Sequence, residues 1–100
     1  MIVVRNVFKL KFGKAREAIA AIKEIAAVTP PASGGESGVR VLTDVTGDFY
    51  TLVLELSDKD LTAFEQRAKK TMADPQWQAA YQKLTPLVES GHREIFNVVA

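Results

Sequence analysis

Few side chains in this sequence are of a type that could act as an acid or a base on a substrate. His92 is the single histidine, and nothing in the sequence supplies a partner that would orient its ring. Glu55 is a second candidate base, inside a long apolar run. The simpler interpretations are a solvated histidine for His92 and cross-strand pairing with Arg5 or Lys9 for Glu55.

Aromatic side chains could line a binding pocket. Trp77 and Tyr81 stand one helical turn apart, so they could form the floor of a pocket between a helix and a sheet, with Tyr50 as a third wall. Core packing is the simpler alternative, because aromatic residues on the apolar face of a helix usually just bury area. The pocket candidates are therefore Tyr50, Glu55, Trp77, Tyr81 and His92.

Several kinds of site are not expected. The chain has no cysteine, which excludes disulfides, thiolate nucleophiles and cysteine-bound zinc. Asp44 and Asp48 flank a turn too short for a calcium loop. Residues 34–38 match neither a nucleophile elbow nor a phosphate-binding loop. We expect no metal site and no bound cofactor.

The charge balance argues against an anionic partner. Thirteen Lys and Arg residues face twelve Asp and Glu, giving a net charge of +1, whereas nucleic acid or an anionic membrane would call for a basic patch. The densest basic cluster is Arg67, Lys69 and Lys70, which we expect on the solvated face of a helix. No stretch has the length of a membrane span, and no signal peptide is recognisable, so the cytoplasm is the expected location.

Composition predicts one globular domain over residues 1–100, with 47% apolar residues. Periodicity predicts strands at 2–12, 39–45, 49–56 and 94–99, helices at 14–28, from Ser57 or Asp58 to about Ala73, and from Asp74-Pro75 onward, and a loop at 29–38. Pro86 should fray the last helix and Gly91 should end it. Thr46-Gly47-Asp48 should join two strands into an antiparallel hairpin.

This β-α-β-β-α-α-β order predicts an α+β, ferredoxin-like fold, with helices on one face of a four-stranded antiparallel sheet. Leu52, Leu54 and Leu56 would face the helices with Phe8, Leu10 and Phe12; Phe49, Thr51, Val53 and Glu55 would share the other face with Arg5, Val7 and Lys9. An RNA-recognition module has a similar order, but the aromatic residues that would stack bases are missing apart from Phe49.

The run at 49–56 scarcely alternates between apolar and polar residues, which indicates a strand buried on both faces. One chain of this size has helices for only one face. We therefore expect a second copy to cover the other face in a sheet-on-sheet homodimer.

Four segments resemble the NIPSNAP-like branch of the dimeric α+β barrel superfamily: Phe8-Lys-Leu-Lys-Phe-Gly-Lys14, residues 40–53, Ala73-Asp-Pro75 and residues 86–96. The resemblance implies the fold and the pairing of two chains, and no catalytic residue. Members of that superfamily include cofactor-free monooxygenases, haem-degrading enzymes, small isomerases and proteins without a known role.

Two hypotheses follow. The first is a NIPSNAP-like homodimeric protein with no catalytic constellation, whose apolar positions would fill the core and the interface, with the binding of a small molecule as an option. The alternative is a cofactor-independent monooxygenase or isomerase that acts on a small substrate such as an aromatic one, with His92 or Glu55 as the base and Tyr50, Trp77 and Tyr81 as walls.

Overall fold

The computed structural model describes residues 1–29 and 39–100, so nearly all of the predicted loop at 29–38 lies outside the described residues. The elements are β1 (Ile2–Leu10), α1 (Ala15–Val28), β2 (Arg40–Thr43), β3 (Thr51–Asp58), α2 (Leu61–Met72), α3 (Pro75–Leu84), the 3₁₀ turn η1 (Thr85–Leu87) and β4 (Val88–Asn97). The predicted β-α-β-β-α-α-β order is confirmed.

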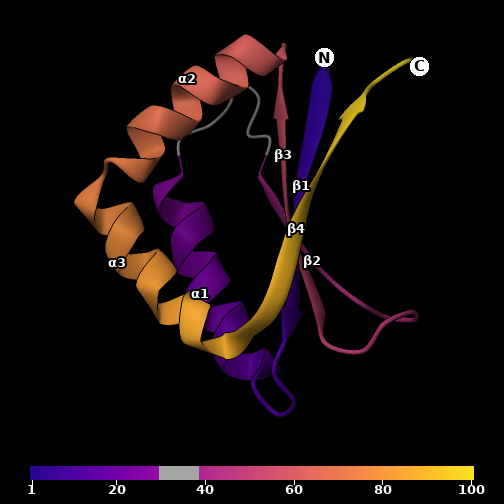
Figure 1. Cartoon of the computed structure of the whole chain (residues 1–100), viewed down its shortest axis with the longest axis vertical. Coiled ribbons are helices and arrows are strands. Elements are labelled where there is room, and N and C mark those ends of the chain that lie inside the picture. The colour runs from indigo at the N-terminus through magenta and orange to yellow at the C-terminus, as the bar shows by residue number, and fades with distance from the viewer. Residues whose placement is uncertain (30–38) are drawn as a thin grey trace.

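The four strands form one sheet in the order β2-β3-β1-β4, and every neighbouring pair is antiparallel. Figure 1 shows α1, α2 and α3 on the same side of this sheet. The ferredoxin-like α+β architecture is therefore confirmed, and the described part of the chain leaves the second side of the sheet uncovered.

Strand register decides which side chains meet the helices. Val4 lies opposite Leu56 on β3 and opposite Ile95 on β4. Because directly opposed residues share a face, the even-numbered residues of β1 and β3 face the helices, and Leu52, Leu54 and Leu56 are buried there as predicted. Phe12 is an exception: β1 ends at Leu10, and the Phe12 side chain is 78% exposed.

The buried side chains form two clusters under the helices. The larger lies between the sheet, α1 and α3, and consists of Leu10, Ala18, Ala21, Ile22, Ile25, Leu52, Leu54, Ala80 and Leu84. The smaller lies between the sheet and α2, and consists of Ile2, Val4, Leu56 and Phe64. The amphipathic pattern of α1 explains the first cluster, because its isoleucines recur at helical spacing.

The helix α2 begins later than predicted. Strand β3 continues through Asp58, so neither Ser57 nor Asp58 caps the helix; the Asp60 carboxylate does, accepting a hydrogen bond from the Ala63 amide at 2.8 Å. Within α2, Ala63 and Phe64 are buried, whereas Leu61 and Met72 are exposed.

The helix α3 begins as predicted. Asp74 accepts a hydrogen bond from the Gln76 amide at 2.9 Å, and Pro75 occupies the first helical position, where it has no amide to lose.

The last strand begins at Val88 rather than at residue 94, so the prediction that Gly91 ends a helix is wrong. Gly91 lies inside β4 opposite Phe8, where an added Cβ would stand 3.2 Å from the Val7 carbonyl oxygen and 3.3 Å from the Phe8 ring. Gly91 therefore permits a close approach of β4 to β1. Pro86, expected to fray the helix, lies in η1 directly after α3.

The predicted β2–β3 hairpin is confirmed, with a longer connection over residues 44–50. The carboxylate of Asp44 accepts a hydrogen bond from the Thr51 amide at 2.9 Å, and Tyr50 adopts a left-handed backbone with φ of 62°. This conformation is uncommon for a residue other than glycine, and it delays the start of β3 to Thr51.

Candidate functional site

A cavity of about 750 Å³ lies between the sheet and the helices. It separates the two core clusters, since Ile22 and Leu54 border it from the larger cluster, and Leu56 and Phe64 from the smaller. Its other walls are Asn6, Phe8, Ile25, Thr29, Arg67, Ala68, Thr71, Met72, Trp77, Tyr81, Val88, Ser90, Gly91, His92 and Arg93. The lining is thus mainly apolar and aromatic, with a few polar groups, as is typical of small-molecule sites.

Two of the predicted pocket residues form one wall. Trp77 and Tyr81 lie on α3, and their rings stack with centroids 4.8 Å apart and an angle of 13° between the planes. Both side chains are half-buried, so they contact the core on one side and the cavity on the other. The helical spacing that brings them together also presents a broad aromatic surface to the cavity.

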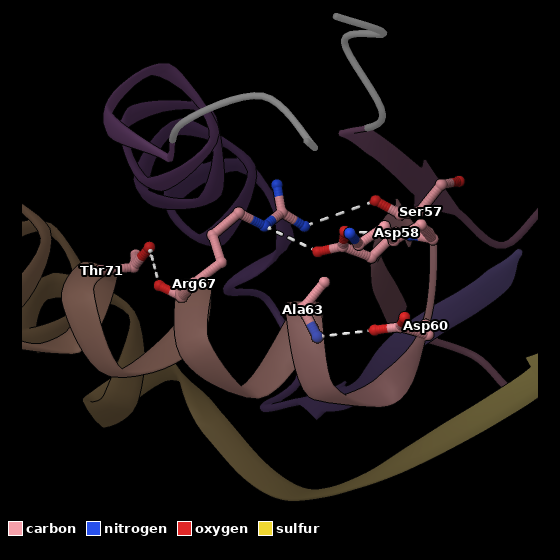
Figure 2. A network of polar contacts seen from close by, with 7 residues as sticks. Ser57, Asp58, Asp60, Ala63, Arg67 and Thr71 are labelled. Atoms are coloured by element: carbon pink, nitrogen blue, oxygen red, sulfur yellow. Dashed lines mark hydrogen bonds and ion pairs between the residues drawn. The ribbon is translucent and has the colours of Figure 1, made fainter. Parts of the chain in front are cut away.

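Arg67 on α2 is held by a polar network at one end of the cavity. Figure 2 shows its guanidinium directed toward the end of β3, where Nε lies 3.1 Å from the buried Asp58 carboxylate and Nη2 donates to the Ser57 carbonyl at 3.5 Å. The Thr71 hydroxyl donates to the Arg67 carbonyl at 2.9 Å. Arg67 was expected on a solvated face, but its side chain is only 12% exposed.

Arg93 approaches the same cavity from β4. Its Nε donates to the Asn6 side-chain oxygen at 2.7 Å, and its guanidinium carbon lies 5.3 Å from the centre of the Phe64 ring. Asn6 and Arg93 are directly opposed across β1 and β4, on the side that faces the helices. The sheet therefore places a cation in the lining, and the amide and aromatic contacts orient it.

Of the other three predicted site residues, His92 reaches the cavity and Tyr50 and Glu55 do not. His92 borders the cavity, but its register partner is Val7, on the uncovered side of the sheet, where its Nε2 lies 3.2 Å from the Glu94 carboxylate. Tyr50 is absent from the lining and packs edge-on against Phe12, with ring centroids 4.9 Å apart. Glu55 is also absent from the lining.

Glu55 instead belongs to a row of charges that crosses the uncovered side of the sheet. Register places Arg40, Glu55, Arg5 and Glu94 side by side on β2, β3, β1 and β4. The Glu55 carboxylate accepts hydrogen bonds from Arg5 at 2.9 Å and from Arg40 at 2.6 Å, and its side chain is 6% exposed. The predicted cross-strand pairing of Glu55 with Arg5 is confirmed.

These contacts set the pKa of Glu55. Burial on its own would raise the pKa, but the hydrogen bonds and positive charges of Arg5 and Arg40 outweigh it and hold the pKa of this carboxyl below its usual value. Glu55 is therefore ionised at neutral pH and has both carboxylate oxygens engaged, which makes it a poor proton acceptor for a substrate.

Apolar side chains lie beside the charged row. Leu42, Val53 and Val7 are opposed on neighbouring strands, and Phe96 lies under the Arg5 guanidinium at 5.4 Å. Val7 and Val53 are half-buried, while Leu42 and Phe96 are 36% and 48% exposed. We call this uncovered side, with its charged row and apolar row, the open face.

Two further properties bear on function. Within residues 1–29 and 39–100, no group of three or more His, Asp or Glu side chains is arranged to hold a metal ion. No helix of the described chain is both long and apolar enough to cross a membrane.

Solved structures with similar folds include NIPSNAP proteins. An uncharacterised NIPSNAP-like domain protein from Burkholderia xenovorans matches with a TM-score of 0.85 and 22% identity, covering 99% of this chain and 85% of its own. A NIPSNAP family protein from Agrobacterium tumefaciens matches with a TM-score of 0.83 and 23% identity, covering 95% and 82%. An antibiotic biosynthesis monooxygenase matches with a TM-score of 0.73 and 13% identity, covering 100% of both chains.

No family model matches the chain, and no curated protein matches it. At these identities the likeness concerns the course of the backbone and carries no residue roles. The resemblance seen in the sequence is thus supported by structural matches over nearly the whole length, and this chain has the fold of NIPSNAP family proteins.

Proposed function

We propose that this protein is a homodimeric binding protein that holds one small, largely apolar molecule per subunit in the cavity between its helices and its sheet. The observation that carries the proposal is the cavity itself. Its volume of about 750 Å³ falls within the range of ligand pockets, roughly 300–1,000 Å³. Part of its wall is exposed to solvent, as at Met72, Ser90 and Arg93, so a bound molecule would remove apolar surface from water.

The lining supports an apolar or aromatic ligand. Stacked Trp77 and Tyr81 offer a flat surface on α3, and Phe8 and Phe64 add rings from the sheet and from α2. Aromatic side chains bury large areas against planar ligands and prefer stacked or edge-on contacts. The lining has few polar side chains. These would orient the ligand, and the apolar surface would supply most of its affinity.

The open face supports pairing with a second copy. Its charged row has alternating signs, from Arg40 through Glu55 and Arg5 to Glu94. A two-fold axis along the strands reverses this order in the second copy, so each arginine would meet a glutamate. The apolar row would gain burial at about 25 cal/mol per Å². A face that is complementary to itself in charge favours an identical partner over a different one.

The alternative of a cofactor-independent monooxygenase or isomerase requires a base within reach of a bound substrate. Glu55 lies on the open face and is engaged by two arginines, and His92, which borders the cavity, contacts the Glu94 carboxylate. The fold shared with an antibiotic biosynthesis monooxygenase, at 13% identity, assigns no catalytic role to any residue of this chain. The proposal therefore ends at binding and includes no reaction.

Backbone amide NMR during titration with naphthalene-2-carboxamide, a flat neutral probe, tests the cavity. We expect the largest shifts at lining residues of α2, α3 and β4, and quenching or a spectral change of Trp77, the single tryptophan. No saturable shifts at the lining, or shifts confined to the open face, would contradict the proposal.

A variant that fills the cavity provides the control. Ala68 lies in the lining on α2, so Ala68→Phe should weaken binding of the probe at least tenfold. Ala79 is exposed on α3 and outside the lining, so Ala79→Phe adds the same ring without filling the space and should leave binding unchanged. Equal affinity for both variants would place the probe elsewhere.

A further inference from the structure

We infer that the natural ligand of the cavity is an anion: an apolar or aromatic body that carries one carboxylate or a comparable acidic group, bound through Arg93. This inference rests on the proposed binding function and adds the charge of the ligand. It depends on which groups Arg67 and Arg93, the two arginines of the lining, contact, and on the charge of the other lining side chains.

The charge of Arg67 is compensated within the protein. Its Nε lies 3.1 Å from Asp58, a carboxylate with a fully buried side chain. Asp58 is not itself part of the lining, so the pair presents the arginine to the cavity while the acid lies behind it. A ligand that took this arginine from Asp58 would leave a buried carboxylate without its cation, which is strongly destabilising. Arg67 is therefore unsuited to be the main anchor for an anion.

Arg93 differs in its partners. Within the described residues no carboxylate lies within ion-pair distance of its guanidinium, and its polar contact is the neutral Asn6 amide. Glu94, its neighbour in sequence, faces the opposite side of the sheet. Arg93 is an exposed residue, and its positive charge has no oppositely charged side chain at short range within the described residues.

Arg93 is also oriented before any ligand arrives. The bond from Nε to Asn6 at 2.7 Å and the contact with the Phe64 ring at 5.3 Å fix the plane of the guanidinium. With Nε engaged, the two terminal nitrogens form the remaining edge of the fork, and this edge fits the two oxygens of a carboxylate. Pre-orientation reduces the entropy lost when the anion binds.

The other side chains of the lining also favour a negatively charged ligand. The described lining residues include two arginines and neither aspartate nor glutamate, so no fixed negative charge on this wall would attract a cation. The aromatic wall of Trp77 and Tyr81 and the side chains of Phe8, Ile22 and Leu54 leave most of the surface apolar. A cavity with one uncompensated cation in an apolar lining fits an amphipathic anion better than a sugar, a polyamine or a polyphosphate.

Three probes with the same ring system separate charge from shape. Isothermal titration calorimetry at neutral pH would compare naphthalene-2-carboxylate, naphthalene-2-carboxamide and naphthalen-2-ylmethylammonium. We expect the carboxylate to bind about tenfold or more tightly than the amide, because hydrogen bonds to charged groups are about twice as strong as neutral ones, and the ammonium compound to bind most weakly. Equal affinity of carboxylate and amide would overturn the inference and leave the proposed cavity intact. Binding of none of the three would overturn both.

The variant Arg93→Gln tests whether Arg93 causes the preference for the carboxylate over the amide. This variant should bind the carboxylate no more tightly than the amide, with the amide affinity unchanged within about twofold, and Arg93→Lys should keep part of the preference. Arg16 is exposed on α1 outside the lining, so Arg16→Gln removes the same charge and should leave all three affinities unchanged. A carboxylate preference that survives Arg93→Gln, or that falls equally with Arg16→Gln, would overturn the assignment. The comparison of probes on the unaltered protein stands even if a variant folds poorly.

Discussion

Arg5 and Arg93 lie on neighbouring strands of one sheet, and each packs over a phenylalanine ring at a similar distance, 5.4 Å to Phe96 and 5.3 Å to Phe64. Their polar partners differ. Arg5, on the open face, pairs with the Glu55 carboxylate at 2.9 Å, whereas Arg93, on the helix-covered face, bonds to the Asn6 amide at 2.7 Å. The positive charge of Arg5 is therefore compensated by a carboxylate, whereas, within the described residues, that of Arg93 is not.

The two faces of the sheet therefore have different roles. On the open face the charges are paired in a row that stabilises the sheet and suits a second copy. On the covered face the side chains are mostly apolar, and one cation borders a cavity. Substitutions on the two faces should therefore differ in kind: covered-face changes should alter stability and ligand binding, and open-face changes should alter assembly and pH dependence.

The largest effect on stability is expected from a truncation on the covered face. Leu52 is fully buried in the larger core cluster, so Leu52→Ala should lower the free energy of unfolding by about 2–5 kcal/mol. The matched change on the open face, Leu42→Ala, removes the same atoms from a residue that is 36% exposed in the single subunit, so it should cost clearly less when the protein is dilute enough to be monomeric. Urea unfolding at one protein concentration measures both. Equal losses would mean that the two faces are equally buried.

A charge on the open face should act on assembly. Val53 lies in the apolar row opposite Val7, so Val53→Asp should place an unpaired carboxylate in the proposed sheet-to-sheet contact and weaken the proposed dimer by a factor of about 100 or more. Sedimentation velocity over a dilution series reports this as monomers. Val53→Thr keeps the shape without the charge and should remain far closer to the parent, and a fully intact Val53→Asp dimer would contradict the face assignment.

Glu55→Gln should reduce stability and flatten its pH dependence. Removing the charge that Arg5 and Arg40 hold should cost about 1–2 kcal/mol at neutral pH, a modest figure because both arginines are partly exposed. Since the folded pKa of Glu55 lies below its usual 4.5, the contribution is fully present above that value and is lost as the pH falls through the folded pKa. The difference between parent and variant in thermal unfolding should therefore shrink below about pH 4.5, and a difference that grows on acidification would contradict the account.

The smallest effect is expected from a comparison of the two arginines. Arg5→Gln breaks a bond to a carboxylate, and Arg93→Gln breaks a bond to an amide, so the first should destabilise the ligand-free protein more than the second by roughly 0.5–1 kcal/mol. Thermal unfolding without ligand measures the difference. A larger loss for Arg93→Gln would show that Arg93 has a structural role, and would weaken the case that it is kept for a ligand.

Much of the fold was predictable because local patterns determine it. Strand alternation located β1, the nearly continuous apolar run located β3, isoleucine spacing located α1, and Asp74-Pro75 located the start of α3. The errors lie where tertiary contact overrides local signals. Gly91 resembles a helix terminus in sequence, but it packs against β1 inside a strand. Pro86, which precedes this strand, is accommodated in a short 3₁₀ turn.

The site was only partly predictable. The helical spacing of Trp77 and Tyr81 placed them together, and both do border the cavity. Arg93 was not singled out, because its role depends on Asn6, which is 87 residues away in sequence and becomes its neighbour only through the register of β1 and β4. Arg67 was taken for part of a solvated cluster, because nothing local indicates that Asp58 at the end of β3 lies against it.

Native mass spectrometry of the purified protein with naphthalene-2-carboxylate tests the division between the two faces most directly, because one spectrum reports both the number of chains and the number of bound molecules. The account predicts a species of two chains with two molecules of the probe, and for Arg93→Gln, at a probe concentration between the two dissociation constants, mainly a species of two chains with none. A single chain, with or without the probe, would contradict the assignment of the open face to a second copy, and a dimer with one probe would place the ligand between the subunits rather than in each cavity.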